Sequence, residues 1–195
     1  MREATQGCVL AGGAARRMGG EKALRSFGRA PLLAHVVARL APQCAALAVN
    51  ANGDAARLAG FGLPVWPDEV ADRPGPLAGV LAALTHSAHP WLVTAPCDMP
   101  FLPMDLVARL HVARAAAGVP IACAAAGGET QPLLALWPRT LAPALIAALA
   151  AGARGAKDFL AAQGFVAVEW PGAALANLNT PEELAAAEAR QDTCP

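Results

Sequence analysis

Residues 10–22 read LAGGAARRMGGEK and begin at the end of a short apolar stretch, Cys8 to Leu10, which predicts a buried strand. Glycine accepts positive φ and leaves room for a ligand beside the backbone. Consecutive exposed backbone N–H groups form an anion-binding concavity, and Arg16, Arg17 and Lys22 add positive charge around it. The pattern predicts a phosphate-binding loop at the end of a first strand. A strand-ending turn with two solvated arginines is the alternative.

Two familiar phosphate loops are absent. The sequence contains no G-x-G-x-x-G and no Gly-Lys-Ser/Thr, which excludes a dinucleotide fingerprint and a Walker loop. Its five cysteines, at positions 8, 44, 97, 123 and 194, form no C-x-x-C pair, which argues against a disulfide framework and a zinc site. A catalytic thiol at Cys97, beside Asp98, is a weaker alternative to its being a small core hydrophobe.

The composition limits the classes of partner. Lys plus Arg and Asp plus Glu number 15 each, so the net charge is zero and nothing favours a nucleic acid or an anionic membrane. The apolar runs 115–128 and 141–153 contain Pro or Gly and are too short for a hydrocarbon layer about 30 Å thick. Residues 1–6 have no apolar segment typical of a secretory signal. We therefore expect a cytoplasmic protein with no membrane or nucleic-acid partner.

Strand-like and helix-like segments alternate along the 195 residues, a length that suits one domain. Strands are expected at 8–10, 45–49, 91–95, 121–124, 133–137 and 165–169, and helices at 32–40, 77–84, 104–117, 141–151, 156–163 and 181–190. Such alternation implies right-handed crossovers and a mainly parallel sheet with helices on both faces. The predicted fold is a single-domain, three-layer α/β/α architecture of Rossmann-like type.

Polar side chains follow the ends of several expected strands. The glycine loop follows Leu10, Asn50 follows one apolar strand, Asp68 comes after Trp66, and Asp98 follows the strand 91–95. In such sheets ligands bind off the carboxyl ends of the strands. These groups are therefore expected at one edge, as an active site. Asn50 and Asp68 also suit plain turns, and Asp98 also suits a helix cap.

Four motifs carry a resemblance to a known family. They are the residue 10–22 loop, Gly75-Pro76-Leu77-Ala78-Gly79, Pro96-Cys97-Asp98-Met99-Pro100 and Asn177-Leu178-Asn179-Thr180-Pro181-Glu182-Glu183-Leu184. Their order and spacing resemble the nucleotidyltransferases that activate sugars and cofactors, over about residues 7–189. The Gly12-Gly13 pair, in place of Ala-Gly, is similar to that of the molybdenum cofactor guanylyltransferases. One departure is that Glu21-Lys22 follows Gly20 directly, where the family usually has one more residue and an Asp.

The resemblance implies a set of site residues. Residues 5–100 would bind the nucleotide and 101–190 the acceptor. Asp98 would hold Mg²⁺, which takes one or two carboxylates plus phosphate oxygens, and Lys22 and Arg17 would assist catalysis with it. The implied nucleotide-binding residues are Leu10, Ala11, Gly12, Gly13, Lys22, Asn50, Asp68, Gly75, Gly79 and Asp98.

Two of the motifs also have local explanations. The 75–79 motif equally suits a tight turn with a helix-packing glycine. Thr180 to Glu183 forms a capping box, which leaves Asn177 and Asn179 unexplained, and the resemblance assigns both to the acceptor.

The implied reaction transfers GMP from GTP to the terminal phosphate of molybdenum–molybdopterin, with pyrophosphate as the second product. Proteins that insert molybdenum or deliver the cofactor are further expected partners. A cytidylyltransferase, or an enzyme for another small phosphate, is the nearest alternative. A non-catalytic nucleotide or cofactor carrier is the alternative from another class.

Overall fold

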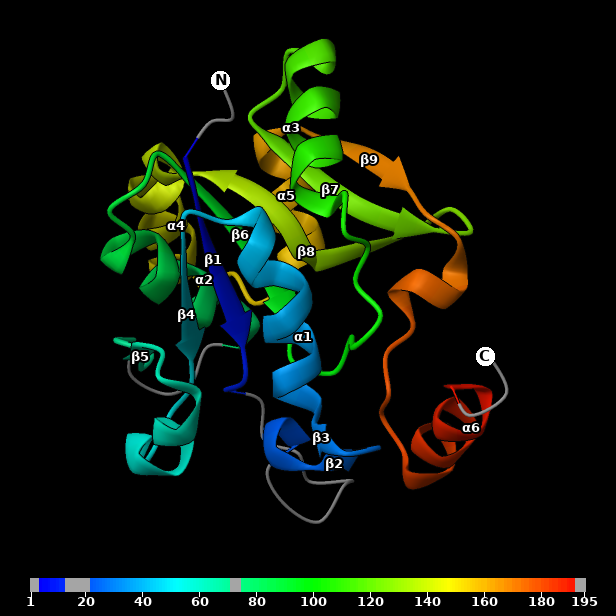
Figure 1. Ribbon diagram of the computed structural model, residues 1–195. Coiled ribbons are helices and arrows are strands. Elements are labelled where there is room, and N and C mark those ends of the chain that lie inside the picture. Colours follow the sequence, from blue (N-terminus) through cyan, green and yellow to red (C-terminus); the bar gives the residue numbers. More distant parts are fainter. Residues whose placement is uncertain (1–3, 13–21, 71–74, 192–195) are drawn as a thin grey trace.

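The computed structural model describes residues 4–12, 22–70 and 75–191. Within them a seven-stranded sheet has the order β5-β4-β1-β6-β8-β7-β9 (Figure 1). Its strands are β1 (Thr5–Leu10), β4 (Ala46–Asn50), β5 (Val65–Trp66), β6 (Trp91–Pro96), β7 (Ile121–Ala126), β8 (Glu129–Pro138) and β9 (Phe165–Glu169). The pairs β1–β4, β1–β6, β4–β5 and β7–β9 are parallel, and β8 is antiparallel to both neighbours. The expected mainly parallel sheet is confirmed.

Helices cover both faces of this sheet, which confirms the three layers (Figure 1). On one face lie α1 (Leu32–Leu40) and α3 (Leu106–Ala117). On the other lie α2 (Pro76–His86), α4 (Ala142–Ala150) and α5 (Ala156–Gln163). Short 3₁₀ turns occupy Lys22–Leu24, Ala41–Gln43, Ala55–Phe61, Arg139–Leu141 and Gly172–Leu175.

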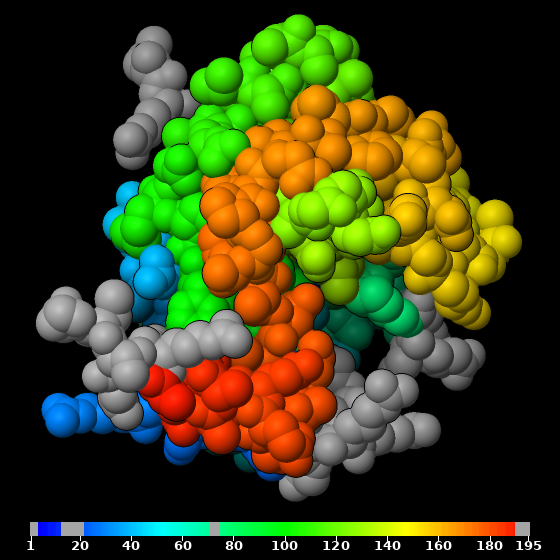
Figure 2. Space-filling model, turned by 90° about the vertical axis from the view of Figure 1, so that its right-hand side faces the viewer, coloured from blue at the N-terminus to red at the C-terminus, as the bar shows by residue number. Residues whose placement is uncertain are grey.

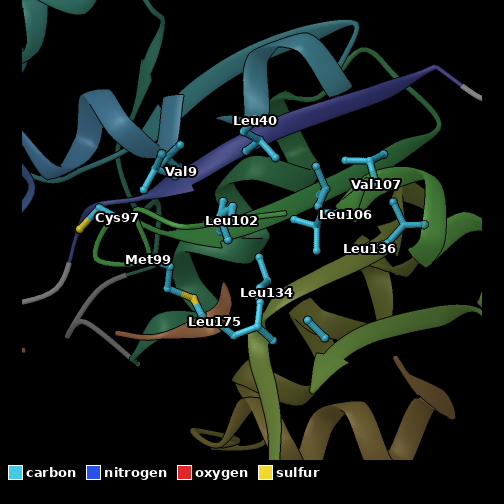
Figure 3. Close-up of a cluster of buried hydrophobic side chains, with 14 of the residues drawn as sticks. Val9, Leu40, Cys97, Met99, Leu102, Leu106, Val107, Leu134, Leu136 and Leu175 are labelled. Atoms are coloured by element: carbon cyan, nitrogen blue, oxygen red, sulfur yellow. The ribbon is translucent and has the colours of Figure 1, made fainter. Parts of the chain in front are cut away.

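Strand side chains alternate between two cores. Cys8 packs with the α2, α4 and α5 side, whereas Val9 packs with the α1 and α3 side. Strands buried on both faces are apolar in consecutive positions. Figure 3 shows the α1–α3 core, in which Leu102, Leu134 and Leu175 belong to one cluster of buried side chains. These two cores hold the strands of the sheet in place.

A third cluster lies away from the sheet. The final helix α6 (Pro181–Gln191) packs through Leu184 and Ala187 on a small hairpin, β2 (Ser26–Phe27) and β3 (Ala30–Pro31) (Figure 1). Glu188 on α6 accepts a hydrogen bond from the Gly28 backbone N–H at 2.6 Å. The C-terminal segment is thereby anchored beside the segment that follows the glycine loop.

Strand β8 differs from the sequence expectation in its start, and β2, β3 and β5 were not among the expected strands. Gly127 and Gly128, with φ of 60° and 79°, form a two-residue turn between β7 and β8. Positive φ at both central positions is typical of the tight hairpin turn, so β8 returns antiparallel and starts before the expected 133. No helix in the described part of the chain has both the length and the apolar character of a membrane span.

Candidate functional site

The ends of three neighbouring strands are tied together beyond the sheet. The Ala11 N–H donates to the Asn50 carbonyl at 2.8 Å, and the Cys97 N–H donates to the Leu10 carbonyl at 3.1 Å. The loops that follow β1, β4 and β6 therefore start side by side, at the edge where the sequence places the candidate groups. Leu10, Ala11 and Gly12 lie there. Gly13 and Arg17 lie outside the described residues.

Three predicted side chains from distant parts of the chain meet at this edge. The Lys22 ammonium donates to Asp98 Oδ2, 76 residues on, and to Asn179 Oδ1, 157 residues on, at 2.6 Å. The Lys22 and Asp98 side chains are only 17% and 14% exposed, so solvent screens this ion pair weakly. The structure thus joins the loop after β1, the loop after β6 and the segment before α6.

The Asn179 segment is held by backbone as well as side-chain contacts. The Leu178 N–H donates to the Asp98 carbonyl at 2.9 Å. Glu183 Oε2 accepts from the backbone N–H groups of Asn179 and Thr180, and the Glu183 N–H donates to Thr180 Oγ1. The predicted capping box is confirmed. Figure 2 shows this segment, in orange, running along the surface into α6, in red. Asn177 is half-buried on the same segment, and among the described residues the Lys22 ammonium donates to Asp98 and Asn179.

One oxygen of the Asp98 carboxylate is open to a ligand. Its Oδ1 is buried and has no hydrogen-bond partner among the described residues, whereas Oδ2 accepts from Lys22. A buried carboxylate oxygen without a partner is costly unless a ligand completes it. Within residues 4–12, 22–70 and 75–191, no group of three or more His, Cys, Asp or Glu side chains converges on a metal position. The arrangement fits Mg²⁺, which takes one or two carboxylates and completes its shell with phosphate oxygens and water.

A second polar network lies at the ends of β4 and β5. The Asn50 side chain is 2% exposed, and its Nδ2 donates to the Trp66 carbonyl and to Asp68 Oδ1, both at 2.9 Å. Both amide hydrogens are therefore engaged inside the protein. Asn52 Nδ2 donates to Asp68 Oδ2 at 2.7 Å, and Asn52 Oδ1 accepts from the Asp68 N–H at 2.9 Å. Sequence reasoning missed Asn52. The one sequence feature that could have indicated Asn52 is its spacing of two residues from Asn50, which places both amides on the same side of an extended segment.

Two of the predicted glycines make room for Asn50. A Cβ at Gly12 would lie 3.3 Å from Asn50 Oδ1, and a Cβ at Gly79 would collide with the same oxygen. Gly79 is therefore a packing glycine of α2 beneath the site. Gly75, with a φ of 88°, precedes Pro76 at the start of that helix. The local explanation of the 75–79 motif is the one these contacts support.

Gly79→Ala is expected to destabilise the protein. Overpacking costs about 1–3 kcal/mol, which exceeds the gain in helix propensity of about 1 kcal/mol. The Asn50 side chain must rotate and lose its bonds to Trp66 and Asp68. Urea denaturation measures the loss of stability. Gly60→Ala is the matched control, because a Cβ there meets no atom within 4 Å. Unchanged stability in Gly79→Ala would contradict this packing role.

The Cys97 thiol is buried beside Asp98. Its pKa is raised to about 12, mainly by burial and also by the negative charge of Asp98, with Lys22 acting in the opposite direction. The thiol is therefore protonated at neutral pH, and a thiol is a poor nucleophile in that form. The burial and the raised pKa argue against the weaker sequence alternative of a catalytic cysteine.

Comparisons with known proteins agree on one family. Residues 7–168 match the model of the MobA-like NTP transferase domain. A relative from Rhodopseudomonas palustris strain BisB5, a molybdenum cofactor guanylyltransferase, is 52% identical and covers 95% of this chain and 93% of its own. One of the same name from Nitrobacter hamburgensis is 45% identical, with coverage of 94% and 93%. The crystal structure of molybdopterin-guanine dinucleotide biosynthesis protein A from Archaeoglobus fulgidus is similar with a TM-score of 0.78, 25% identity and coverage of 96% and 98%.

Proposed function

The chain belongs to the MobA-like NTP transferase family and is a nucleotidyltransferase, and we propose that it transfers GMP from GTP to the terminal phosphate of molybdenum–molybdopterin. A phosphate oxygen of the acceptor forms a bond to the α-phosphorus of GTP. The bond from that phosphorus to the bridging oxygen breaks, and pyrophosphate leaves with the electron pair. The products are the guanine dinucleotide form of the cofactor and pyrophosphate.

The cluster of Lys22, Asp98 and Asn179 is the observation that carries this proposal. A phosphate monoester is anionic at neutral pH, so the attack requires positioning and charge neutralisation more than a strong general base. Lys22 lies between the strand-end loops and the segment before α6. Its ammonium can leave Asp98 for the phosphate oxygens of GTP and offset the charge that develops there. Asn179 would orient that ammonium or the acceptor, with Asn177 beside it.

Asp98 is proposed to hold Mg²⁺ through Oδ1, which has no hydrogen-bond partner in the described part of the chain. When bound, Mg²⁺ would supply Lewis-acid polarisation of the phosphate oxygens. The residue's own contribution is a rigid carboxylate. Its carbonyl accepts the Leu178 N–H, and the Cys97 N–H next to it bonds to β1, so the backbone is held on two sides.

Asp68 is proposed to contact the guanine base. Each of its carboxylate oxygens accepts one hydrogen bond inside the protein, and an ionised carboxylate has about four acceptor positions in all. Guanine presents two parallel N–H donors on its Watson–Crick edge, whereas cytosine presents one donor next to a ring acceptor. A fixed carboxylate therefore favours guanine. The Asn50 amide donates both of its hydrogens inside the protein, and one of these hydrogen bonds holds Asp68 Oδ1 in place.

The test supplies Mg²⁺ and molybdenum–molybdopterin with either GTP or CTP and measures pyrophosphate release. We expect GTP to be used faster by at least about 100-fold, because a site built for specific donors rejects a nucleotide that lacks them. Equal or faster use of CTP would contradict the guanine assignment. Nucleotide binding without any pyrophosphate release would favour the carrier alternative. A cytoplasmic location and exchange with molybdenum-insertion and cofactor-delivery proteins belong to the same proposal.

A further inference from the structure

Asn52 makes two complementary hydrogen bonds to a single residue. Its Nδ2 donates to Asp68 Oδ2 at 2.7 Å, and its Oδ1 accepts from the Asp68 backbone N–H at 2.9 Å. The Asn52 backbone is fixed in turn, because Arg57 Nη2 donates to its carbonyl at 2.5 Å. Asn52 is therefore hydrogen-bonded to both the side chain and the main chain of Asp68.

The Asn52–Asp68 hydrogen bonds do more than stabilise a loop, because they fix the orientation of the Asp68 carboxylate. Asn50 holds Asp68 Oδ1 and Asn52 holds Oδ2, so rotation of the carboxylate would break two bonds at once. A Cβ on Gly12 would lie 3.4 Å from Asn52 Nδ2. Asn52 thus lies between Gly12 and Asp68, two of the residues that the proposed function assigns to nucleotide binding.

We propose that Asn52 is a positioning residue for base selection, which sets the Asp68 carboxylate so that both oxygens face the paired N–H donors of a guanine. This inference rests on the proposed function, in which Asp68 contacts the base. It adds that selectivity depends on the second amide as well as on the carboxylate. If Asn52 only stabilised its loop, its loss would weaken all nucleotides alike.

The experiment measures the affinities of GTP and CTP by calorimetry and the melting temperature of each variant. Asn52→Ala is expected to lower the affinity for GTP by roughly 10- to 100-fold, which corresponds to the loss of one hydrogen bond to a charged group. CTP affinity is expected to change little, so the preference for GTP falls. Asn52→Asp is expected to lower the affinity for GTP at least as much, because its carboxylate repels that of Asp68. This variant keeps the oxygen that accepts from the Asp68 N–H. Parallel losses for GTP and CTP would overturn the inference.

Gln43→Ala is the matched control for the loss of a bridging amide. Gln43 joins α1 to α3 through bonds to the Arg39 and Pro103 carbonyls and the Val107 N–H, away from the site. We expect it to lower the melting temperature and leave both affinities unchanged.

Asp68→Asn separates this inference from its premise. If Asp68→Asn reduces the GTP preference and neither Asn52 variant does, the role of Asn52 is overturned and the proposed function stands. If Asp68→Asn leaves the preference intact, the premise that Asp68 reads the base fails as well.

Discussion

Asp98→Asn is expected to lower kcat for GMP transfer by about 1,000-fold. Neutralisation of phosphate charge by a carboxylate-held cation is worth several kcal/mol, and each 1.36 kcal/mol corresponds to about tenfold in rate. The substitution keeps the size of the side chain and an oxygen that can accept from Lys22, so the fold is expected to persist. Pyrophosphate release at saturating GTP and a range of Mg²⁺ concentrations measures the effect, and circular dichroism verifies the fold.

Asp105→Asn makes the same chemical change outside the site. Asp105 is 59% exposed and lies 3.8 Å from Arg109 one helical turn away, an arrangement worth about 0–1 kcal/mol. Its rate is expected to match that of the wild-type protein. A rate for Asp98→Asn equal to the control would show that Asp98 holds no catalytic metal. A loss that excess Mg²⁺ fully reverses would instead show that the carboxylate sets metal affinity alone.

The layered fold could be predicted because its signals are local. The apolar run 91–95 becomes β6, and Pro76 starts α2 as a first-turn proline should. Alternation of strands with helices then restricts the topology to a mainly parallel sheet. The strand at 133–137 was expected, but the earlier start and antiparallel direction of β8 were not, because their signal, Gly127-Gly128, lies inside a small-residue run that carries no alternating pattern. The family resemblance, which rests on spacing between motifs, is confirmed by the relatives and the domain match.

The sequence predicted which residues belong to the site better than it predicted which of them contact one another. Lys22, Asp98 and Asn179 were each expected near phosphate or acceptor, yet their bonds span 76 and 157 residues and depend on how α6 packs on the β2–β3 hairpin. Asn52 was missed for a similar reason. Its residue type is the common one for turns, and its partnership with Asp68 exists only once β4 and β5 lie side by side.

Lys22→Met is expected to lower kcat by about 100- to 1,000-fold, the usual effect of losing one preorganised charge donor in an active site. Methionine keeps an unbranched chain of similar length and removes only the ammonium. The charge on the phosphate oxygens grows toward the transition state, so kcat is expected to fall more than KM rises. Steady-state kinetics of pyrophosphate release measures both constants. Lys22→Arg restores charge with a different shape and is expected to recover part of the rate.

The double variant Lys22→Met with Asp98→Asn tests whether the two side chains act on the same phosphates. Their direct ion pair, on side chains only 17% and 14% exposed, places them in one electrostatic unit. When two residues act as a unit, the fold-reduction in kcat of the double variant is far smaller than the product of the two single fold-reductions. The double variant is therefore expected to be about as slow as the slower single variant. Losses that multiply would contradict a shared role, because independent groups contribute additively to the activation free energy.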